Sequence, residues 1–508
     1  MVGPGDAPFI HVVADGSTVR ADGVATASFG HRVTGGAHGS DGVFAEWKFD
    51  GERLTVETDR YGMYPLFVHV GRGAIMVSPS IPQLLDLGAP RGLDFDALCV
   101  FLHIGFFLRD ETPFRAIRAL PPGGRLAWTR DGLSRDGLGR DALSIDGAVV
   151  RTPPIEIGYD QAVDAYVDLF RQAMRRRPPQ GRGAVPLSGG RDSRHILLEL
   201  LAGGHTPDVC VTARHFPPRS DEDAAVASRV AAALGLRHVL LDLADEFEAE
   251  TAKNVATSFC TDEHAWFATV AAYLERGFTT VYDGIGGDVL SAGLFLNADR
   301  VAQQVQGRYH DLAEVFLKAR SARTLAGVLA RGLRTRLSRA RAQERIAAEL
   351  AAHADAANPI GSFCFWNRTR REIALAPYAL GPAAATIYAP YLDHDLYDFL
   401  SALPAAMLVD RRFHTATITR AFPEHAGLAY ENPNDPGVDG RAQDRRFATA
   451  LLHSRWARRD VDRPLLGPSF RRRLRWAASA MSALGAERTR LQPRLALYLC
   501  QLGELGGA

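Results

Sequence analysis

The chain has 508 residues, of which 46% are hydrophobic, 23% charged and 9% aromatic, and its formal net charge is +1. This length implies more than one domain, and the composition is ordinary for a soluble globular protein. A net charge so close to zero provides no long-range field for nucleic acid or an anionic membrane, so neither is expected as a partner.

The five cysteines are scattered and form no C-x-x-C pair. Neither a zinc site nor a disulfide framework is therefore indicated, and a reduced, cytoplasmic setting is expected. No signal peptide is visible at the start of the sequence. The longest apolar run, residues 97–108, contains His103 and is too short to span a bilayer, so we expect a buried helix there.

The first 130 residues are rich in glycine and in short alternating apolar runs. Turn residues separate these runs, as they do in antiparallel sheets. We predict strands at 54–58, 66–70, 74–78 and 125–129, and helices at 81–88 and 94–108. Residues 130–155 are polar and rich in Gly and Asp, so we place the domain boundary there and expect domains at 1–150 and 151–508.

From residue 159 the pattern changes to helices that alternate with short apolar strands. Such alternation predicts an α/β domain with a parallel sheet covered by helices. The expected helices are 159–176, 192–202 and 221–235, and the expected strands are 183–187, 208–213 and 237–243. Beyond residue 300 the chain is expected to be mostly helical.

The segment Ser188-Gly-Gly-Arg-Asp-Ser193 ends one strand and opens one helix. Its glycines allow close backbone approach to a phosphate, and the helix N-terminus offers free N–H groups. Ser188 and Ser193 can donate hydrogen bonds, and Asp192 can hold Mg²⁺. The alternative is a tight strand–helix turn with Asp192 as a cap. No Walker or dinucleotide motif is present.

A second glycine-rich turn, Asp283-Gly-Ile-Gly-Gly-Asp288, also follows an expected strand. In an open parallel sheet, ligands lie at the carboxyl ends of the strands. The two turns are therefore expected to meet at one crevice, where Asp192 and Asp288 hold Mg²⁺ on the pyrophosphate of ATP.

Together these motifs resemble the asparagine synthetase family, with its β-lactam synthetase and lasso-peptide cyclase relatives. Four further segments are similar to family motifs in the same order: residues 59–66 (DRYGMYPL), 112–123 (TPF…LPPG), 220–238 (SDED…LGLRH) and 389–395 (APYLDHD).

The resemblance implies a glutaminase-like α+β sandwich of the N-terminal-nucleophile type, followed by a PP-loop synthetase domain. It also implies an ATP-dependent ligase that adenylates a carboxylate and couples it to an amine. The candidate catalytic residues are Asp192, Asp288 and Arg191, and the two aspartates are the candidate Mg²⁺ ligands. The candidate ATP- and pyrophosphate-binding residues are Leu187, Ser188, Gly189, Gly190, Asp192, Ser193, Val211, Asp283 and Gly284.

Three family roles lack their usual residue. The second residue is Val2 rather than the nucleophilic cysteine, so the glutaminase reaction is expected to be absent. Ile285 replaces an acid or tyrosine. The family's late lysine is missing, because no lysine follows Lys318 and Glu431 falls near its place. Arginine can supply the charge instead. The candidates are Arg191, Arg194, Arg214, Arg441, Arg445 and Arg446.

Other polar groups were weighed against structural roles. Asp262, Glu263 and His264 can serve as a base or binder, but capping of a helix start is favoured. Core packing is favoured for Tyr391 and His394. The basic runs 175–177 and 471–475 are expected to be solvated helix faces.

The function predicted is therefore an ATP- and Mg²⁺-dependent ligase without its own glutaminase activity. Its carboxylate is a peptide or a small acid, which leaves open a lasso-type macrolactam cyclase with a peptide-processing partner protein. One alternative is a degenerate family member that binds a nucleotide or a partner. Another retains the adenylating fold but uses a different acceptor, such as a thiol.

Overall fold

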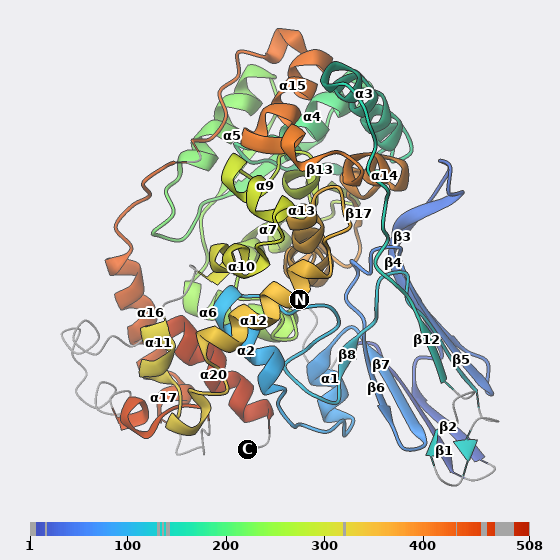
Figure 1. Cartoon of the computed structure of the whole chain (residues 1–508), viewed down its shortest axis with the longest axis vertical. Coiled ribbons are helices and arrows are strands. Elements are labelled where there is room, and N and C mark those ends of the chain that lie inside the picture. Colours follow the sequence, from blue (N-terminus) through green and yellow to red (C-terminus); the bar gives the residue numbers. More distant parts are fainter. Residues whose placement is uncertain are drawn as a thin grey trace.

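The computed structural model describes residues 7–15, 18–129, 133–134, 137–138, 143–317, 322–432, 434–458, 465–472 and 492–506. Two antiparallel sheets form one end of the molecule, and helices surround a parallel sheet at the other (Figure 1). The predicted fold class, an α+β sandwich followed by a parallel-sheet α/β domain with a mostly helical C-terminal part, is confirmed.

The two antiparallel sheets have five strands each. Alternate residues of their strands face inward and form one core, in which the indole rings of Trp47 and Trp128 are buried. One sheet has the order β2 (Thr18–Gly23), β1 (Ile10–Asp15), β7 (Ala74–Ser78), β6 (Phe67–Gly71) and β8 (Arg118–Ala119). The other has the order β12 (Leu143–Asp146), β9 (Arg125–Thr129), β5 (Arg53–Thr58), β4 (Ser40–Phe49) and β3 (Thr26–Thr34). A short hairpin pairs β10 (Leu133–Ser134) with β11 (Gly137–Leu138).

The turn after β5 is organised by Asp59, whose side chain is fully buried. Its carboxylate accepts hydrogen bonds from the backbone N–H groups of Tyr61, Met63 and Tyr64. Burial, only partly offset by these bonds, raises the pKa of Asp59 to about 6. The DRYGMYPL segment therefore has a structural role in the sandwich.

The parallel sheet has the order β15 (His238–Leu241), β14 (Val209–Ala213), β13 (Gly183–Pro186), β16 (Thr280–Tyr282) and β17 (Thr386–Tyr388). The chain first adds strands on one side of β13 and then on the other. The order therefore reverses between β13 and β16, and crevices for ligands form at such switch points, outside the carboxyl ends of the strands.

Helices cover this sheet and form the C-terminal part, as predicted. Before β17 they are α1 (Ile81–Asp86), α2 (Phe95–Ile104), α3 (Tyr159–Arg175), α4 (Asp192–Ala202), α5 (Glu222–Ala233), α6 (Glu246–Ala256), α7 (Phe267–Leu274), α8 (Gly287–Leu290), α9 (Ala298–Val305), α10 (Tyr309–Leu317), α11 (Ala322–Val328), α12 (Arg339–Ala351), α13 (Pro359–Phe363), η3 (Cys364–Ile373) and η4 (Ala376–Leu380). After it come α14 (His394–Ser401), η6 (Ala405–Arg411), α15 (Arg412–Ala421), α16 (Arg441–His453), α17 (Arg455–Arg458) and α20 (Pro493–Leu505).

The strands and helices predicted from the sequence are all present, with ends shifted by a few residues. Residues 97–108 do begin with the buried helix α2. Within 130–155, β12 pairs with β9, so the last strand of the sandwich lies later than the strands we predicted. The boundary near residue 150 stays a prediction. Val2, Lys318 and residues 473–475 lie outside the described residues.

The expectation of a solvated basic face at 175–177 is wrong for its last residue. The Arg177 side chain is 1% exposed and bonds to Asp41 at 2.8 Å and Asp393 at 2.6 Å. Arg176 also pairs with Asp393. The reason is tertiary: the end of α3 meets β4 of the sandwich and the start of α14, where two buried carboxylates need a cation.

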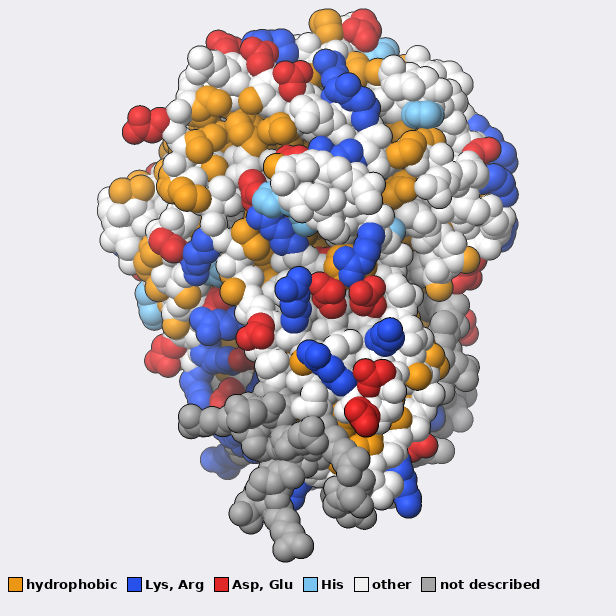
Figure 2. All heavy atoms as spheres, turned by 90° about the vertical axis from the view of Figure 1, so that its right-hand side faces the viewer, with side chains coloured by type: hydrophobic (Ala, Val, Ile, Leu, Met, Phe, Trp, Pro, Cys, Tyr) orange, Lys and Arg blue, Asp and Glu red, His pale blue; other side chains and the backbone are white. Residues whose placement is uncertain are grey.

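The surface carries both signs of charge. On the face presented in Figure 2, acidic and basic side chains are interspersed rather than gathered into one field. None of the helices in the described part of the chain is both long and apolar enough to cross a membrane. All five cysteines lie in the described part of the chain, where they are buried and form no disulfide.

Candidate active site

The two glycine turns meet at the switch point of the parallel sheet. A Cβ atom placed on Gly287 would stand 2.6 Å from Cγ of Asp192, and one placed on Gly284 would stand 2.8 Å from its Cβ. The second turn therefore packs directly on Asp192, at the start of α4, and both positions need glycine for that close approach. The predicted juxtaposition of the two turns is present.

The segment Ser188–Ser193, called the phosphate loop from here on, is held by its own hydroxyl groups. The Ser193 Oγ accepts a hydrogen bond from the Ser188 N–H at 3.0 Å, and the Ser188 Oγ accepts one from the Gly190 N–H at 3.2 Å. The Gly189 N–H donates to Oδ1 of Asp223 at 2.8 Å. The N–H groups of Ser188, Gly189 and Gly190 are therefore held in fixed directions. Two of them, those of Ser188 and Gly190, donate to hydroxyl groups that can rotate toward a phosphate.

The Asp192 carboxyl group lies close enough to Asp288 for negative charges on the two groups to repel each other. Its side chain is 25% exposed. Burial and then the charge of Asp288 raise its pKa well above the ordinary value, although Arg191 and Arg411 act against this. A bound divalent cation would relieve that repulsion. Behind it, the Tyr391 hydroxyl donates to the Asp192 carbonyl at 3.2 Å.

A cleft of about 590 Å³ opens beside the phosphate loop. This volume lies within the range of small-molecule sites. One end is apolar, with Val211, Trp266 and Val270, and the other end is charged. Its lining residues are Pro186, Leu187, Ser188, Val211, Thr212, Ala213, His215, Pro218, Arg219, Ser220, Glu222, Asp223, Trp266, Val270, Arg411, Glu431, Asn432, Asp435, Pro436 and Gly437.

Three predicted binding residues, Leu187, Ser188 and Val211, line this cleft. Asp283 and Gly284 are not among the cleft-lining residues, and Gly284 packs against Asp192 and Ser193 of the phosphate loop instead. The Asp283 N–H donates to the Tyr388 carbonyl, its carboxylate accepts from the Ile285 N–H, and burial raises its pKa to about 6. The binding roles of all the predicted site residues stay predictions.

The predicted arginines are placed differently from one another. The Arg191 Nε donates to Thr415 at 2.7 Å, and its guanidinium lies 4.3 Å from the centre of the Tyr430 ring. Arg194 is buried and donates to the carbonyls of Leu428 and Ala429.

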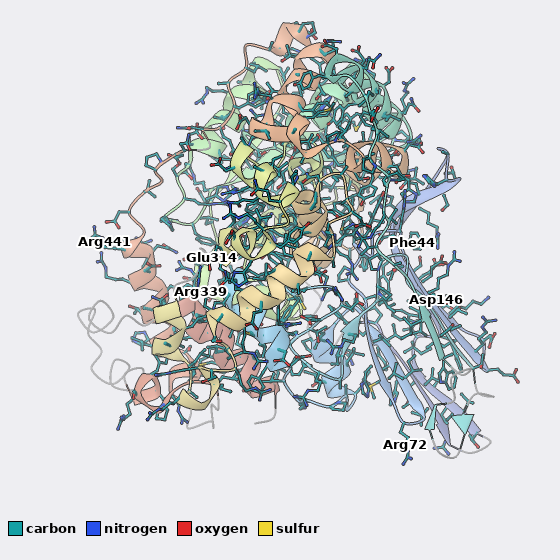
Figure 3. All side chains as sticks on the ribbon, in the orientation of Figure 1. Phe44, Arg72, Asp146, Glu314, Arg339 and Arg441 are labelled. Carbon is teal, nitrogen blue, oxygen red and sulfur yellow. The ribbon has the colours of Figure 1, made fainter. Side chains whose placement is uncertain are left out.

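The remaining predicted arginines lie outside the cleft. Arg214 pairs with Asp221 and Asp242 on the surface. Arg441, Arg445 and Arg446 lie on α16. The Arg441 side chain is 81% exposed and projects at the periphery of the molecule (Figure 3).

The residues Asp262, Glu263 and His264 do not cap a helix, so that expectation is wrong. Helix α7 begins later, after Trp266, without a side-chain cap. Asp262 instead lies against Gly105, and Glu263 lies 3.6 Å from Arg368. The cause is packing of this segment against α2 and η3. His264 is buried. Tyr391 and His394 are buried as well, so packing is confirmed for these two residues.

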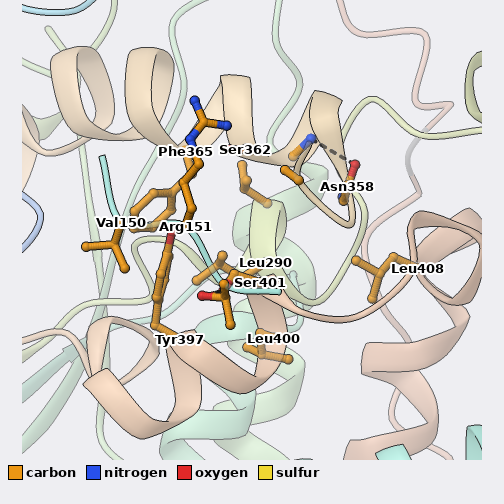
Figure 4. Close-up of a pocket in the computed structure, with 14 residues that line it drawn as sticks. Val150, Arg151, Leu290, Asn358, Ser362, Phe365, Tyr397, Leu400, Ser401 and Leu408 are labelled. Atoms are coloured by element: carbon orange, nitrogen blue, oxygen red, sulfur yellow. Dashed lines mark hydrogen bonds between the residues drawn. The ribbon is translucent and has the colours of Figure 1, made fainter. Parts of the chain in front are cut away.

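A second cavity lies behind α8 and is shown in Figure 4, where Val150, Leu290, Phe365 and Tyr397 surround it. Its volume of about 30 Å³ holds water but no substrate. The cleft of about 590 Å³ is the candidate active site, because Ser188 of the phosphate loop and the preceding Leu187 line it.

Sequence reasoning missed several groups at this site. Asp223 belongs to the family-like SDED segment, so its position had a signal. Arg411 and His414 had none, because they reach the site only through the packing of α15 against α3 and the phosphate loop. Among the described residues, no group of three or more His, Cys, Asp or Glu side chains can hold a metal by itself.

A parallel sheet with a glycine-rich phosphate loop at its switch point defines a nucleotide-binding α/β protein. Residues 165–425 match the family profile described as asparagine synthase, and residues 25–137 match the one described as a glutamine amidotransferase domain. The first match covers half of the chain. The protein therefore belongs to the asparagine synthase family.

Curated relatives are more distant. The chain is 29% identical over 214 residues to putative glutamine-hydrolysing asparagine synthetases of Mycobacterium tuberculosis (strain ATCC 25618 / H37Rv) and Mycobacterium bovis (strain ATCC BAA-935 / AF2122/97). The match covers 41% of this chain and 32% of each relative, so the chain spans about a third of their length.

Two solved structures share short similarities with the chain. NMN synthetase from Francisella tularensis is 16% identical, with 42% of this chain and 93% of that chain covered and a TM-score of 0.21. The glutamine phosphoribosylpyrophosphate amidotransferase from B. subtilis is 11% identical, with 45% and 47% covered and a TM-score of 0.16. The fold described above rests on the strand order of the protein itself.

Proposed function

We propose that this protein is an ATP- and Mg²⁺-dependent ligase that adenylates a carboxylate and couples it to an amine or ammonia. The observation that carries the proposal is the contact between the two glycine turns, which packs the turn that carries Asp288 against Asp192 at the start of α4. The cleft lined by Leu187 and Ser188 adjoins the same loop. Membership of the asparagine synthase family supports the same reaction class.

The residues fit a bound magnesium ion. Mg²⁺ usually takes one or two carboxylates from the protein and its other ligands from water and substrate phosphates. Asp192 and Asp288 are two such carboxylates, and their mutual repulsion favours a cation between them. The ion would neutralise charge on the leaving pyrophosphate.

Other side chains of the protein would bind the remaining parts of the nucleotide. Leu187 and Val211 offer an apolar wall for the adenine, and the hydroxyl groups of Ser188 and Ser193 offer donors to the pyrophosphate. The carboxylate oxygen of the acid attacks the α-phosphorus, and pyrophosphate leaves. The amine nitrogen then attacks the carbonyl carbon of the acyl adenylate, AMP leaves, and the nitrogen loses a proton to form the amide.

The proposal includes no glutaminase step. Cys99 is the one cysteine in residues 1–150, and it is buried, with Sγ donating to the Ser338 carbonyl. Burial raises the pKa of its thiol to about 11, so little nucleophilic thiolate forms at neutral pH. The amine comes from free ammonia or from a substrate, and the acid is a peptide or a small carboxylic acid.

A degenerate nucleotide-binding protein is the second candidate. The observation in its favour is that the Gly189 N–H is not free to bind a phosphate, because it already donates to the carboxylate of Asp223. Glu431 lies beside that carboxylate. Ile285 also offers no group that can take a proton from an amine.

The first test is the thermal shift of the purified chain with MgATP, compared for wild type, Asp192→Asn, Asp288→Asn and the surface control Asp86→Asn. Ligand at ~100 times its dissociation constant adds roughly 2.7 kcal/mol of stability. We expect a Mg²⁺-dependent shift in wild type and Asp86→Asn that both site variants lose. No shift in wild type would rule out the ligase.

The second test separates the two candidates. Pyrophosphate release is followed with MgATP and ammonium while small acids and peptides are supplied in turn. Release that depends on one acid and on Asp192 supports the ligase. Nucleotide binding without release for any acid, and with intact protein, favours the degenerate binding protein.

A further inference from the structure

The charged end of the cleft holds an excess of acidic side chains. Glu222, Asp223, Glu431 and Asp435 line it, against the two arginines Arg219 and Arg411. A triphosphate is strongly anionic, so repulsion by these carboxylates must be offset where its phosphates lie. Mg²⁺ on Asp192 and Asp288 would offset part of it. The rest of this repulsion must be offset by a positively charged side chain of the protein close to the phosphate loop.

The other arginines near the loop are already engaged. Arg191 bonds to Thr415 and stacks on Tyr430, and Arg194 is bound to backbone carbonyls. Arg219 also lines the cleft, but it is exposed. Arg411, in contrast, is half-buried, lines the cleft and acts electrostatically on Asp192.

Arg411 is held in an unusual backbone conformation. Asp410 has φ 60° and ψ 22°, and Arg411 has φ 58° and ψ 12°, so two successive residues with Cβ atoms are left-handed. Such strain persists only where the surroundings fix it, and it gathers at functional sites. Here the Thr415 hydroxyl donates to the Arg411 carbonyl at 3.0 Å and accepts from Arg191, which ties this backbone to the phosphate loop.

The Arg411 guanidinium forms neither a hydrogen bond nor an ion pair with any residue in the described part of the chain. No hydrogen-bond acceptor is bound to it there, and no carboxylate lies within 4.0 Å. Its charge acts on Asp192, on Glu431 and on Arg191, which are all on the loop side of the cleft. The side chain is therefore a half-buried cation that lines the cleft and acts on Asp192 and Glu431 without a fixed partner among the described residues.

We infer that Arg411 is the catalytic cation of this site and that it binds the pyrophosphate portion of ATP. The inference rests on the proposed function, because it requires MgATP in this cleft. Arg411 would contact the β- and γ-phosphate oxygens and stabilise the charge that develops on pyrophosphate as it leaves. It would leave the adenine end, at Val211 and Trp266, unaffected.

The test compares wild type with Arg411→Gln, Arg411→Gly and Arg411→Lys, and with Arg412→Gln as the matched control. Glycine adopts the left-handed conformation freely, so Arg411→Gly removes the side chain without straining the backbone. Arg412 is the next residue, and its side chain is 78% exposed. Binding of MgATP, magnesium pyrophosphate and AMP is measured by calorimetry.

We expect Arg411→Gln and Arg411→Gly to weaken MgATP and magnesium pyrophosphate about ten- to a hundredfold, which is the usual effect of losing a charged hydrogen bond. AMP should change by less than about twofold, Arg411→Lys should recover part of the loss, and Arg412→Gln should match wild type. If Arg411→Gln fails to fold, Arg411→Gly decides the question.

Two results would overturn the inference alone: unchanged MgATP affinity in Arg411→Gly, or an equal loss for AMP and MgATP. In both cases wild type still binds MgATP and the proposed function stands. Failure of wild type to bind MgATP would overturn the proposed function and this inference together.

Discussion

The Nδ1 atom of His414 lies 3.3 Å from Oδ1 of Asp192. The same Nδ1 lies 2.9 Å from the Ser291 Oγ, and the Tyr391 hydroxyl lies 3.3 Å from Nε2. The His414 side chain is fully buried, and this burial lowers its pKa well below the ordinary value. The imidazole that contacts Asp192 is therefore neutral and supplies no positive charge. The charge of the carboxylate would instead be offset by a bound cation.

Replacement of His414 by Phe should weaken magnesium binding more than it weakens folding. Asp192 would lose the imidazole that contacts it, so we expect the Mg²⁺ concentration needed for the MgATP shift to rise about tenfold. The free energy of unfolding should fall by about 1–3 kcal/mol because buried polar groups lose a partner. His414→Asn, which restores an amide near Nδ1, should lie between the two. An Mg²⁺ requirement that stays at the wild-type level in His414→Phe would show that Asp192 is held without His414.

Gly287→Ala should abolish MgATP binding while leaving the fold intact. The new methyl group would stand 2.6 Å from Cγ of Asp192, so the carboxylate must move. The control is Gly503→Ala in α20, where no atom lies within 4 Å of the added methyl group. That variant should keep the MgATP shift and gain about 0.5–1 kcal/mol of stability, because alanine favours a helix more than glycine does. Thermal shift and urea denaturation measure both effects.

Glu431 should make nucleotide binding depend on pH near neutrality. Burial and then the neighbouring Asp223 raise its pKa to about 7, above the ordinary value of about 4.5. MgATP affinity should therefore fall between about pH 6 and about pH 8 as Glu431 gains negative charge. In Glu431→Gln this fall should be smaller, whereas Glu424→Gln, at an exposed site, should behave as wild type.

The same shift predicts a change in stability. A raised pKa in the folded state contributes stability below about pH 4.5 that is lost as the pH rises through about 7. Urea denaturation of Glu431→Gln should give a flatter pH profile over this interval than wild type. Parallel profiles would mean that Glu431 titrates normally in the folded protein.

Arg177→Met should destabilise the contact between the sandwich and the synthetase domain by about 3–5 kcal/mol, because Asp41 would stay buried without its arginine and Asp393 would keep only Arg176. Arg175→Met, at an exposed position two residues earlier, should cost little. Urea denaturation at neutral pH measures both, and a cost in Arg177→Met no larger than in Arg175→Met would contradict the role of the ion pair.

Acid should weaken the same contact. Burial opposes ionisation of Asp41, but Arg177 and then His394 hold its pKa below the ordinary value. A lowered carboxyl pKa contributes stability above about pH 4 that is lost as the pH falls further. Asp41→Asn should therefore lose much of the acid sensitivity that wild type shows as the pH falls below about 4.

The sequence by itself determined the local structure and the order of the two halves. The phosphate loop was recognisable because glycines, hydroxyl groups and a helix start stood in one short segment, residues 188–193. The strands of the parallel sheet were recognisable because they are short apolar runs between helices. The rule that ligands lie at the carboxyl ends of parallel strands then predicted that the turns carrying Asp192 and Asp288 would meet.

Only the tertiary structure decided which distant groups complete the site and which charges are buried. Arg411, His414 and Arg177 belong to segments whose sequences read as ordinary basic or amphipathic helix ends. Their roles depend on which element packs against which, and side-chain patterns of period 3.6 or 2 carry no information about that. A guanidinium is a surface group or a buried ion-pair partner according to the carboxylates that folding brings to it, and here those lie more than a hundred residues away in sequence.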